Sequence, residues 1–327
     1  MKRAAPGTLL LLSTGCRARY AVFDTASPEA HRIANLHWLM LGICVAVAVA
    51  VLALLGIALV RRDRGRYSDG SARRVRAVAA GAAVSAFLLL VLLVASVLAG
   101  REITAPGGPQ ALEVRITGHQ WWWEISYPGS SPSEEVVTAN EIHVPVHRPV
   151  RFLLSSGDVI HSFWVPRLNG KKDLIPGRLT RHIFQVDRPG VFRGQCAEFC
   201  GYQHAHMGFV VVAEEPARFD AWLTAQRGIA AEPAGPSAVH GRTVFLSSPC
   251  VLCHTIRGIG AFGHKAPDLT HVASRTMIAA ATLHNTPGNL AGWILDAPRV
   301  KPGTRMPPNT LAANDLLDLV AYLESLR

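Results

Sequence analysis

The 327-residue sequence is poor in charge, with 17% charged residues, and it contains neither an internal repeat nor a basic stripe with interleaved aromatic residues. The absence of a repeat excludes a solenoid or a similar array. The absence of a basic stripe means that the formal net charge of +10 does not indicate nucleic-acid binding. The length indicates two or three structural units rather than one small domain.

Charged residues are absent altogether from two long apolar runs, 36–60 and 77–99. Each run exceeds the roughly 20 residues that cross a bilayer, and charge-free runs of this length disfavour two buried core helices. The segment between them, 61–76, holds seven arginines and two aspartates, and so five of the ten net positive charges. Because short basic loops stay in the cytoplasm, we expect a transmembrane hairpin over 17–100 with both flanks outside.

The first 16 residues have a basic start, a short apolar stretch and Cys16 after small residues. This pattern resembles a bacterial secretory signal of the lipoprotein type, with Cys16 as the lipidated residue. Ser13 departs from the pattern, since a Leu is usual there. We therefore separate residues 1–16 from the folded domains.

Three segments follow the hairpin. Residues 101–226 contain short runs of β-branched and aromatic residues between Gly, Pro and Ser turns, which predicts an all-β sandwich or barrel. Residues 227–239 are small and include two prolines, as in a linker. Residues 240–327 have a helical pattern. Its last helix is predicted to place four apolar side chains on one face: Leu316, Leu317, Val320 and Leu323.

Cysteine is scarce as well, with six in all, and four of them form two close pairs outside the predicted spans. The first pair, Cys196 and Cys200, lies in GQCAEFCGYQHAHM, whose glycines disfavour a continuous helix and favour a loop between two strands. With His204 and an upstream imidazole such as His161, these thiols could bind zinc. Met207 disfavours zinc, because a thioether is a good copper ligand and a poor zinc ligand. Two bridging thiolates could hold two copper ions, with one His on each.

This stretch, with DVIHSFWVP upstream and DLIPGR between, resembles the binuclear copper (CuA) site of cytochrome c oxidase subunit II, whose architecture is two transmembrane helices and a cupredoxin sandwich. The resemblance implies six copper ligands: the bridging thiolates of Cys196 and Cys200, the imidazoles of His161 and His204, the thioether of Met207 and the carbonyl of Glu198. It also implies that the Glu198 side chain reaches a magnesium ion at the border with subunit I. The resemblance also covers the aromatic stretch GHQWWWEISYP, and it implies that electrons enter the copper site at Trp121. Strand alternation places Trp121 and Trp123 on one face, and core packing explains at least one of the three tryptophans.

The second pair occurs in CVLCH, residues 250–254, the attachment signature of c-type haem. A thioredoxin-like redox pair or half a zinc site is disfavoured by the adjacent His254 and by the absence of a second CxxC. Cys250 and Cys253 would form thioethers, and His254 would be an axial ligand. For the sixth position we choose Met306 in KPGTRMPP over Met277, because prolines and a glycine stiffen that loop. The whole segment resembles a class I cytochrome c.

Together these segments resemble subunit II of bacterial oxidases that carry their own cytochrome c. The resemblance implies a multi-pass subunit of the bacterial inner membrane, with both metal domains on the periplasmic face. Electrons from cytochrome c or a quinol–cytochrome c reductase would pass from haem c to CuA. They would continue to subunit I, where oxygen is reduced to water with proton pumping, and subunit III would be a further partner.

Two alternatives remain: a CuA-type subunit of a nitric oxide reductase, and a membrane-tethered copper-binding or chaperone protein. The sequence also departs from the family at the second span. Many members open this span with a Glu that helps protons to enter subunit I, but RRVRAVAAGAAV contains no acid. That proton route is therefore in doubt for this chain.

Overall fold

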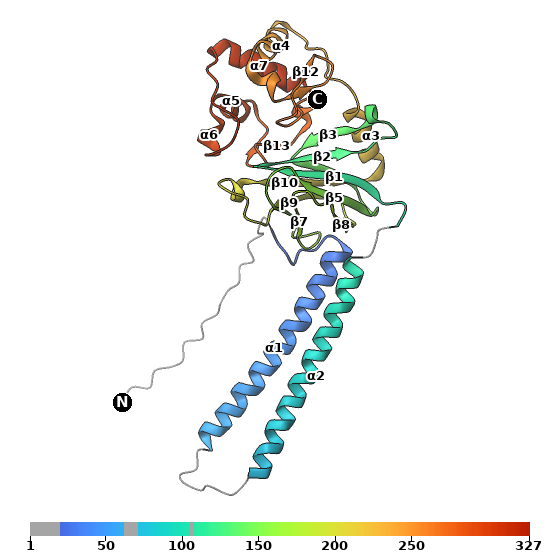
Figure 1. Ribbon diagram of the computed structural model, residues 1–327, viewed down its shortest axis with the longest axis vertical. Coiled ribbons are helices and arrows are strands. Elements are labelled where there is room, and N and C mark those ends of the chain that lie inside the picture. The colour runs from blue at the N-terminus through green and yellow to red at the C-terminus, as the bar shows by residue number, and fades with distance from the viewer. Residues whose placement is uncertain (1–19, 62–70, 105–107) are drawn as a thin grey trace, which may run out of the picture.

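A long helical hairpin carries two outer domains, a β-sandwich and a C-terminal helical domain, which lies on the side of the sandwich away from the hairpin (Figure 1). The computed structural model describes residues 20–61, 71–104 and 108–327. The predicted signal with Cys16, and most of the arginine-rich loop, lie outside these residues. The predicted architecture of two apolar helices, sandwich and helical domain is confirmed.

The hairpin consists of α1 (Pro28–Val60) and α2 (Ser71–Ile103). Ser27 caps α1, since its hydroxyl oxygen accepts a hydrogen bond from the backbone N–H of Ala30 at 3.0 Å. Both helices are long and apolar enough to cross a membrane, and their apolar side chains face outward. At about 1.5 Å per residue each exceeds the roughly 30 Å hydrocarbon core, so their outer turns extend to the sandwich.

The sandwich contains two five-stranded sheets, with the strand orders β3-β2-β1-β5-β8 and β4-β10-β9-β6-β7. The first sheet contains β1 (Leu112–His119), β2 (Trp122–Tyr127), β3 (Val136–Ala139), β5 (Val150–Ser156) and β8 (Thr180–Phe184). The second contains β4 (Glu141–Pro145), β6 (His161–Trp164), β7 (Lys172–Leu174), β9 (Gly190–Cys196) and β10 (Gly208–Glu214). A short turn of helix, η1 (Pro132–Glu134), precedes β3, and α3 (Pro216–Gln226) packs beside β4.

Alternating apolar side chains of both sheets fill the space between them. The rings of Phe163 and Phe209 stack at 4.6 Å, and Trp123 meets Phe209 edge to face at 5.1 Å. All three side chains are buried directly below the strand ends that flank the loop of the first cysteine pair. The core therefore gives those strand ends a rigid base.

The C-terminal domain is mostly helical, with two additional short strand pairs. Its elements are α4 (Pro236–Ser247), η3 (Pro249–Leu252), β11 (Thr255–Ile256), β12 (Ala261–Phe262), η4 (Val272–Ser274), β13 (Met277–Ile278), β14 (Leu283–His284), α5 (Pro287–Leu295), α6 (Ala297–Val300) and α7 (Ala313–Ser325). Helices α4 and α7 pack so closely that a Cβ at Gly241 would lie only 1.9 Å from the carbonyl oxygen of Asp318. Only glycine allows this approach.

The predicted apolar face of the last helix is wrong at one position. Leu317 is 63% exposed, whereas Leu319 is buried together with Val320 and Leu323. The buried face follows the spacing Leu316, Leu319, Val320 and Leu323, which is the i, i+3, i+4, i+7 pattern of one helical stripe.

Candidate metal centres

Strand pairing brings the first cysteine pair to His161. Cys196 is the last residue of β9, and Gly208 begins β10, so residues 197–207 form the connecting loop, including η2 (His204–His206). Strand β6 lies beside β9, with Phe163 opposite Cys196. Because β6 starts at His161, that imidazole lies at the same end of the sheet as the loop. A strand–loop–strand site is thus formed, as the glycines predict.

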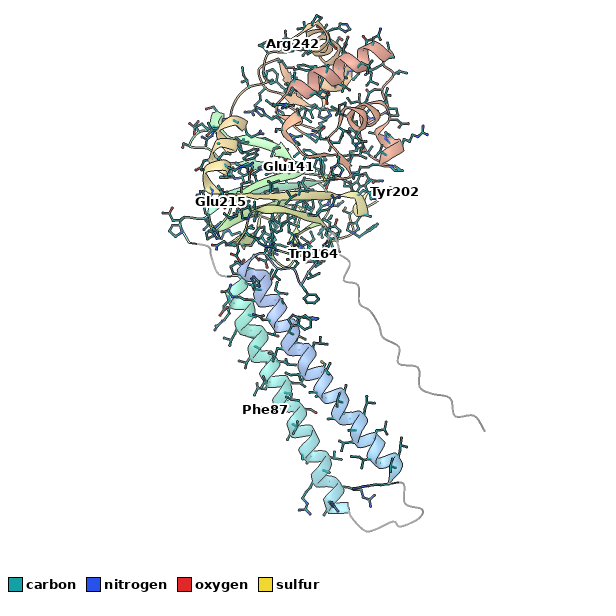
Figure 2. The ribbon with its side chains drawn as sticks, turned by 180° about the vertical axis from the view of Figure 1, so that it is seen from behind. Phe87, Glu141, Trp164, Tyr202, Glu215 and Arg242 are labelled. Atoms are coloured by element: carbon teal, nitrogen blue, oxygen red, sulfur yellow. The ribbon has the colours of Figure 1, made fainter. Side chains whose placement is uncertain are left out.

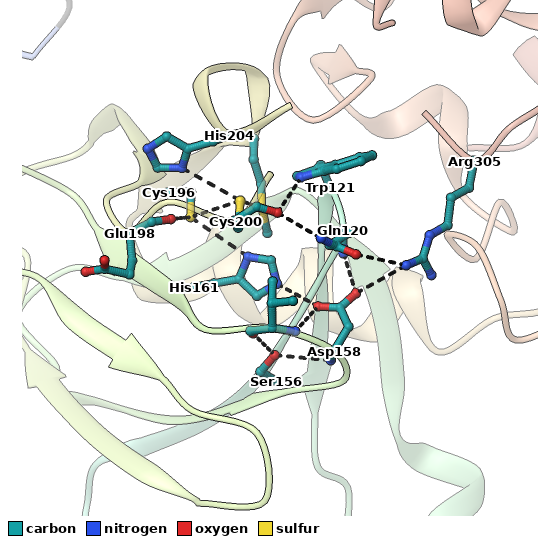
Figure 3. A network of polar contacts seen from close by, with 12 residues as sticks. Gln120, Trp121, Ser156, Asp158, His161, Cys196, Glu198, Cys200, His204 and Arg305 are labelled. Carbon is teal, nitrogen blue, oxygen red and sulfur yellow. Dashed lines mark hydrogen bonds and ion pairs between the residues drawn. The ribbon is translucent and has the colours of Figure 1, made fainter. Parts of the chain in front are cut away.

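The donor atoms of this loop lie close together (Figure 3). The sulfurs of Cys196 and Cys200 are 3.8 Å apart. Nδ1 of His161 lies 3.9 Å from the Cys196 sulfur, and Nδ1 of His204 lies 3.7 Å from the Cys200 sulfur. The Met207 sulfur lies 3.8 Å from that of Cys200. Each thiol therefore has its own imidazole, and the thioether adds a third sulfur.

The Glu198 carbonyl completes this set of six donors, at 3.2 Å from the Cys196 sulfur. Cys196, Cys200 and Met207 are buried, and His204 is half-buried. His206, which has no place in the predicted site, is exposed. Three sulfurs and two imidazoles form a soft donor set, which suits copper better than magnesium, calcium or manganese.

Proton sharing between the two thiols shows how strongly they interact. The hydrogen bond with Cys200 holds the pKa of Cys196 at about 3, and contact with His161 acts in the same direction. The hydrogen bond with the Cys196 thiolate in turn raises the pKa of Cys200. Burial alone would lower the pKa of His161, but hydrogen bonds to Cys196 and Asp158 outweigh it and raise that pKa. Cations that replace these protons would relieve the repulsion between the two thiolates.

The second centre lies at the start of the C-terminal domain. Cys250 is half-buried and Cys253 is exposed, and both are free thiols. His254 has its Nδ1 2.8 Å from the carbonyl oxygen of Pro267, so Nδ1 carries the proton and Nε2 is free to bind a metal. Burial lowers the pKa of His254, which favours the neutral imidazole that ligation requires. These residues fit a covalently attached haem.

The two methionines considered for the sixth position differ in their surroundings. The Met277 sulfur, on β13, lies 3.3 Å from the Arg193 guanidinium of the sandwich. Met306 is half-buried in the segment between α6 and α7. Met277 therefore has a contact across the domain border, while Met306 lies in the loop that the sequence predicts to present sulfur.

Comparison with known proteins adds independent findings. A family model described as "Cytochrome C oxidase subunit II, periplasmic domain" matches residues 130–214, and one described as "Cytochrome c" matches residues 238–327. The cytochrome c oxidase subunit 2 of Alkalihalophilus pseudofirmus is 33% identical over 98% of this chain and 95% of that protein. The chain belongs to the cytochrome c oxidase subunit 2 family.

Other relatives and solved structures are similar over shorter lengths. The cytochrome c oxidase subunit 2 of Bacillus subtilis is 28% identical over 73% of this chain and 71% of that protein. The crystal structure of the periplasmic domain of subunit II of cytochrome oxidase of Bradyrhizobium japonicum is 31% identical and covers 37% of this chain and 97% of that chain, with a TM-score of 0.35.

The structure adds supporting residues to the site of this family member that the sequence reasoning missed. Asp158 lies 2.8 Å from Nε2 of His161, which orients the ring so that Nδ1 faces the sulfur. Gln120 donates from its side-chain amide to the carbonyl oxygen of Cys200 at 2.9 Å. The indole of Trp121, which the sequence had already singled out, donates to the same oxygen at 2.9 Å. The only sequence signal was the position of Asp158, three residues before His161.

The three tryptophans have different surroundings. Trp121 is half-buried and contacts the cysteine loop, while the indole of buried Trp123 donates to the carbonyl oxygen of Met207 at 3.3 Å. Trp122 stacks on His119 with ring centroids 4.6 Å apart. Trp123 is thus core packing, and Trp121 is the tryptophan at the border of the site.

The Glu198 side chain points away from the sulfurs. Its carboxylate lies 3.2 Å from Nζ of Lys171, which also lies 3.9 Å from Asp173. An ammonium group therefore neutralises this carboxylate within the chain.

Proposed function

We propose that this chain is the electron-input subunit of a haem–copper cytochrome c oxidase and that electrons pass from a haem c in its C-terminal domain to a binuclear copper centre. The observation that carries the proposal is the geometry of the sulfur pair. Two buried sulfurs lie 3.8 Å apart, and each has one imidazole nitrogen within 3.9 Å. This arrangement fits two metal ions that share both thiolates.

Cys196 and Cys200 would bridge the copper ions, and His161 and His204 would each bind one through Nδ1. Bound there, the copper pair would supply one-electron redox chemistry, with the odd electron shared between the two copper ions through the thiolates. Met207 and the Glu198 carbonyl would be the weak ligands, as the resemblance implies. Because two of the donors lie at strand ends and the other four lie in the short loop between β9 and β10, the chain would hold both metals in a fixed geometry that changes little with redox state. The six donors would leave no position for substrate.

In the C-terminal domain, Cys250 and Cys253 would attach the haem, and Nε2 of His254 would bind its iron. The haem would supply one-electron redox chemistry. The contact of Met277 with Arg193 supports Met306 as the other axial ligand. A thioether ligand would raise the reduction potential of the haem.

Membership in the family supports subunit I as the partner that reduces oxygen, with subunit III, proton pumping and the periplasmic location as further parts of the proposal. We assign residues 17–100 to the hairpin, 101–226 to the copper domain, 227–239 to a linker and 240–327 to the cytochrome domain, although α4 begins at Pro236. Electrons would enter from a soluble cytochrome c or a quinol–cytochrome c reductase. A magnesium ion at Glu198 would require further ligands from subunit I.

Metal and haem analysis of the purified full chain, with paramagnetic resonance of its oxidised copper, tests the proposal. We expect two copper ions and one covalent haem per chain, and a hyperfine pattern from one electron shared over two equivalent copper nuclei. Zinc in the cysteine loop, with no near-infrared absorption, would contradict it. Consumption of nitric oxide rather than oxygen by the purified complex would instead favour the reductase alternative.

A further inference from the structure

The loop between α6 and α7 belongs to the C-terminal domain and contacts the sandwich, so that it joins the two proposed metal domains by hydrogen bonds. Nζ of Lys301 donates to the carbonyl oxygen of Trp121 at 3.3 Å and to that of Ala279 at 3.4 Å. Arg305 donates to the side-chain oxygen of Gln120 at 3.0 Å. Residues 301–305 therefore contact the turn formed by Gln120 and Trp121, which lies 180 residues earlier in the sequence.

Further contacts surround this meeting point. The side-chain amide of Gln203 donates to the carbonyl oxygen of Pro302, and the backbone N–H of Gly208 donates to that of Ala280 at 3.1 Å. Glu141 lies at the face of the sandwich toward the C-terminal domain (Figure 2), and its carboxylate accepts a hydrogen bond from the backbone N–H of Thr276 at 2.9 Å. The border between the domains thus contains hydrogen bonds over a broad area, and the loop is part of a fixed interface.

Lys301 is unusual because its cationic side chain is buried, with 3% of the residue exposed. Burying an ammonium group is unfavourable unless hydrogen bonds compensate, and burial lowers the pKa of Lys301 to about 8. Its compensation comes from two carbonyl groups, one of which belongs to the sandwich. If the loop left the turn, the Trp121 carbonyl would lose this donor.

Arg305 makes a different contact, since its side chain is 68% exposed. Besides its hydrogen bond to Gln120, its guanidinium lies 4.0 Å from Oδ2 of Asp158 (Figure 3). The same Oδ2 accepts the backbone N–H of Gln120 at 2.7 Å, and Oδ1 lies 2.8 Å from Nε2 of His161. Arg305 directly precedes Met306, so this chain of contacts connects the proposed iron-ligand loop with a proposed copper ligand.

The turn also contacts the other side of the copper site. The Trp121 indole and the Gln120 amide both donate to the carbonyl oxygen of Cys200, a proposed bridging ligand. The turn therefore lies between the loop of Met306 on one side and two copper ligands on the other.

We propose that Lys301 and Arg305 are positioning residues for electron transfer within this chain: they hold the Met306 loop on the Gln120–Trp121 turn, where electrons cross between the two domains. This inference rests on the proposed function. The electron that the reduced haem loses is the electron that the oxidised copper pair gains, and no bond or proton is exchanged. Neither residue binds a cofactor, and both act through the turn.

Three variants of the full chain, assembled with its partner subunits, test this inference. Flash reduction of the haem, followed by haem and copper absorption, gives the first-order rate of electron transfer between them. We expect Lys301→Gln to lower this rate about tenfold, because the charged hydrogen bond to the Trp121 carbonyl, which crosses the border, is lost. Arg305→Gln should lower it about two- to fivefold, as for an exposed ion pair. Arg299→Gln, which removes the same charge from the exposed surface of α6, should leave it unchanged.

Two readouts separate positioning from a general loss of stability. Amide hydrogen exchange in peptides covering 119–122 and 300–306 should become faster in Lys301→Gln, while the copper and haem bands keep their shape. Salt should slow electron transfer in the unmodified chain but not in Arg305→Gln, because salt screens an exposed ion pair. Arg305→Lys should recover most of the rate and of its salt dependence.

An unchanged rate and unchanged exchange in Lys301→Gln, with both chromophores intact, would overturn the inference and leave the proposed function standing. If Lys301→Gln loses its copper band, Arg305→Gln decides: an unchanged rate with unchanged salt dependence would likewise overturn it. A complex of the unmodified chain that contains both chromophores but shows no transfer from haem to copper would contradict the proposed function itself.

Discussion

The two proposed metal centres are built in opposite ways. In the cysteine loop, sheet register and a short connection bring two thiols, two imidazoles and a thioether within 3.7 to 3.9 Å of a neighbouring donor, on top of a packed aromatic core. In the C-terminal domain, Cys253 is exposed, and His254 and Met306 are half-buried on separate segments. Protein folding alone therefore assembles the proposed copper ligands, whereas covalent attachment through a local motif would define the proposed haem site.

The largest effect is expected from a substitution that removes the copper centre and leaves the haem centre intact. Cys196→Ser should abolish the near-infrared copper absorption of the full chain, because a serine hydroxyl stays protonated and cannot bridge soft metal ions. The haem spectrum should not change, since its ligands belong to another domain. Copper analysis and absorption spectra check this, with Cys44→Ser in α1 as a matched loss of one exposed thiol. Unchanged copper bands would refute the ligand assignment.

The reverse experiment acts on the haem centre. Met306→Ala should turn the haem five-coordinate or high-spin, because the strong-field thioether is lost, while the copper absorption stays as it was. Met277→Ala is the matched control, and it should keep a low-spin haem because that sulfur contacts Arg193. If Met277→Ala produces the high-spin spectrum instead, the axial ligand has been assigned to the wrong methionine.

The same contrast explains what the sequence could predict. Five of the six proposed copper ligands lie between 196 and 207, and CVLCH is contiguous, so spacing alone places these residues together. The two apolar spans and the change from β to helical pattern are equally local properties. The sequence could therefore predict both the fold class and the chemistry of the two proposed centres.

What the sequence could not predict depends on packing between distant segments. The contact of Lys301 with the Trp121 carbonyl joins residues 180 positions apart, and no periodicity marks it. Leu316 and Leu317 are adjacent apolar residues, and only the packing of α7 on α4 decides which of them lies on the stripe. Likewise, the role of Asp158 as partner of His161 becomes clear only once β6 is in place.

A smaller effect should destabilise the copper domain alone. A Cβ at Gly194 would lie 2.3 Å from Cζ of Phe209, whose ring is held by Phe163 and Trp123. Gly194→Ala should therefore lower the free energy of unfolding of the sandwich by about 1–3 kcal/mol, the usual effect of overpacking a core. Guanidinium unfolding of the full chain, followed separately at the copper and haem bands, should show the shift at the copper band only.

Gly292→Ala provides the matched control in the C-terminal domain. Nothing lies within 4 Å of a Cβ at this position in α5, and alanine is the better helix former. We expect the haem-band transition to become more stable by about 0.5–1 kcal/mol. A shift of both bands in either variant would show that the domains unfold as one unit.

The smallest expected effect concerns the network that joins the two regions. Buried His143 on β4 has Nδ1 3.0 Å from Glu214 and Nε2 3.2 Å from Glu141, while Glu141 accepts hydrogen bonds from Thr276 of the C-terminal domain. Burial would lower the pKa of His143, but hydrogen bonds and charge from both carboxylates outweigh it and raise that pKa. The Trp222 ring, stacked at 4.0 Å, also favours the cation.

A raised pKa in the folded state fixes the sign of the pH dependence. The stabilisation from His143 is complete below the unfolded pKa of about 6.5 and is lost as pH rises through the higher folded value. Burial would raise the pKa of Glu141, but hydrogen bonds to His143 and Thr276 outweigh it and lower that pKa. The hydrogen bond to His143 likewise lowers the pKa of Glu214. The stabilisation from the two carboxylates is therefore lost as pH falls below about 4.5. His143→Gln should therefore reduce stability most near pH 6 and less near pH 9. A difference in unfolding midpoint that stays constant from pH 6 to pH 9 would show that folding does not raise the pKa of His143. The ion pairs between His143 and the two carboxylates would then not contribute to holding the domains together.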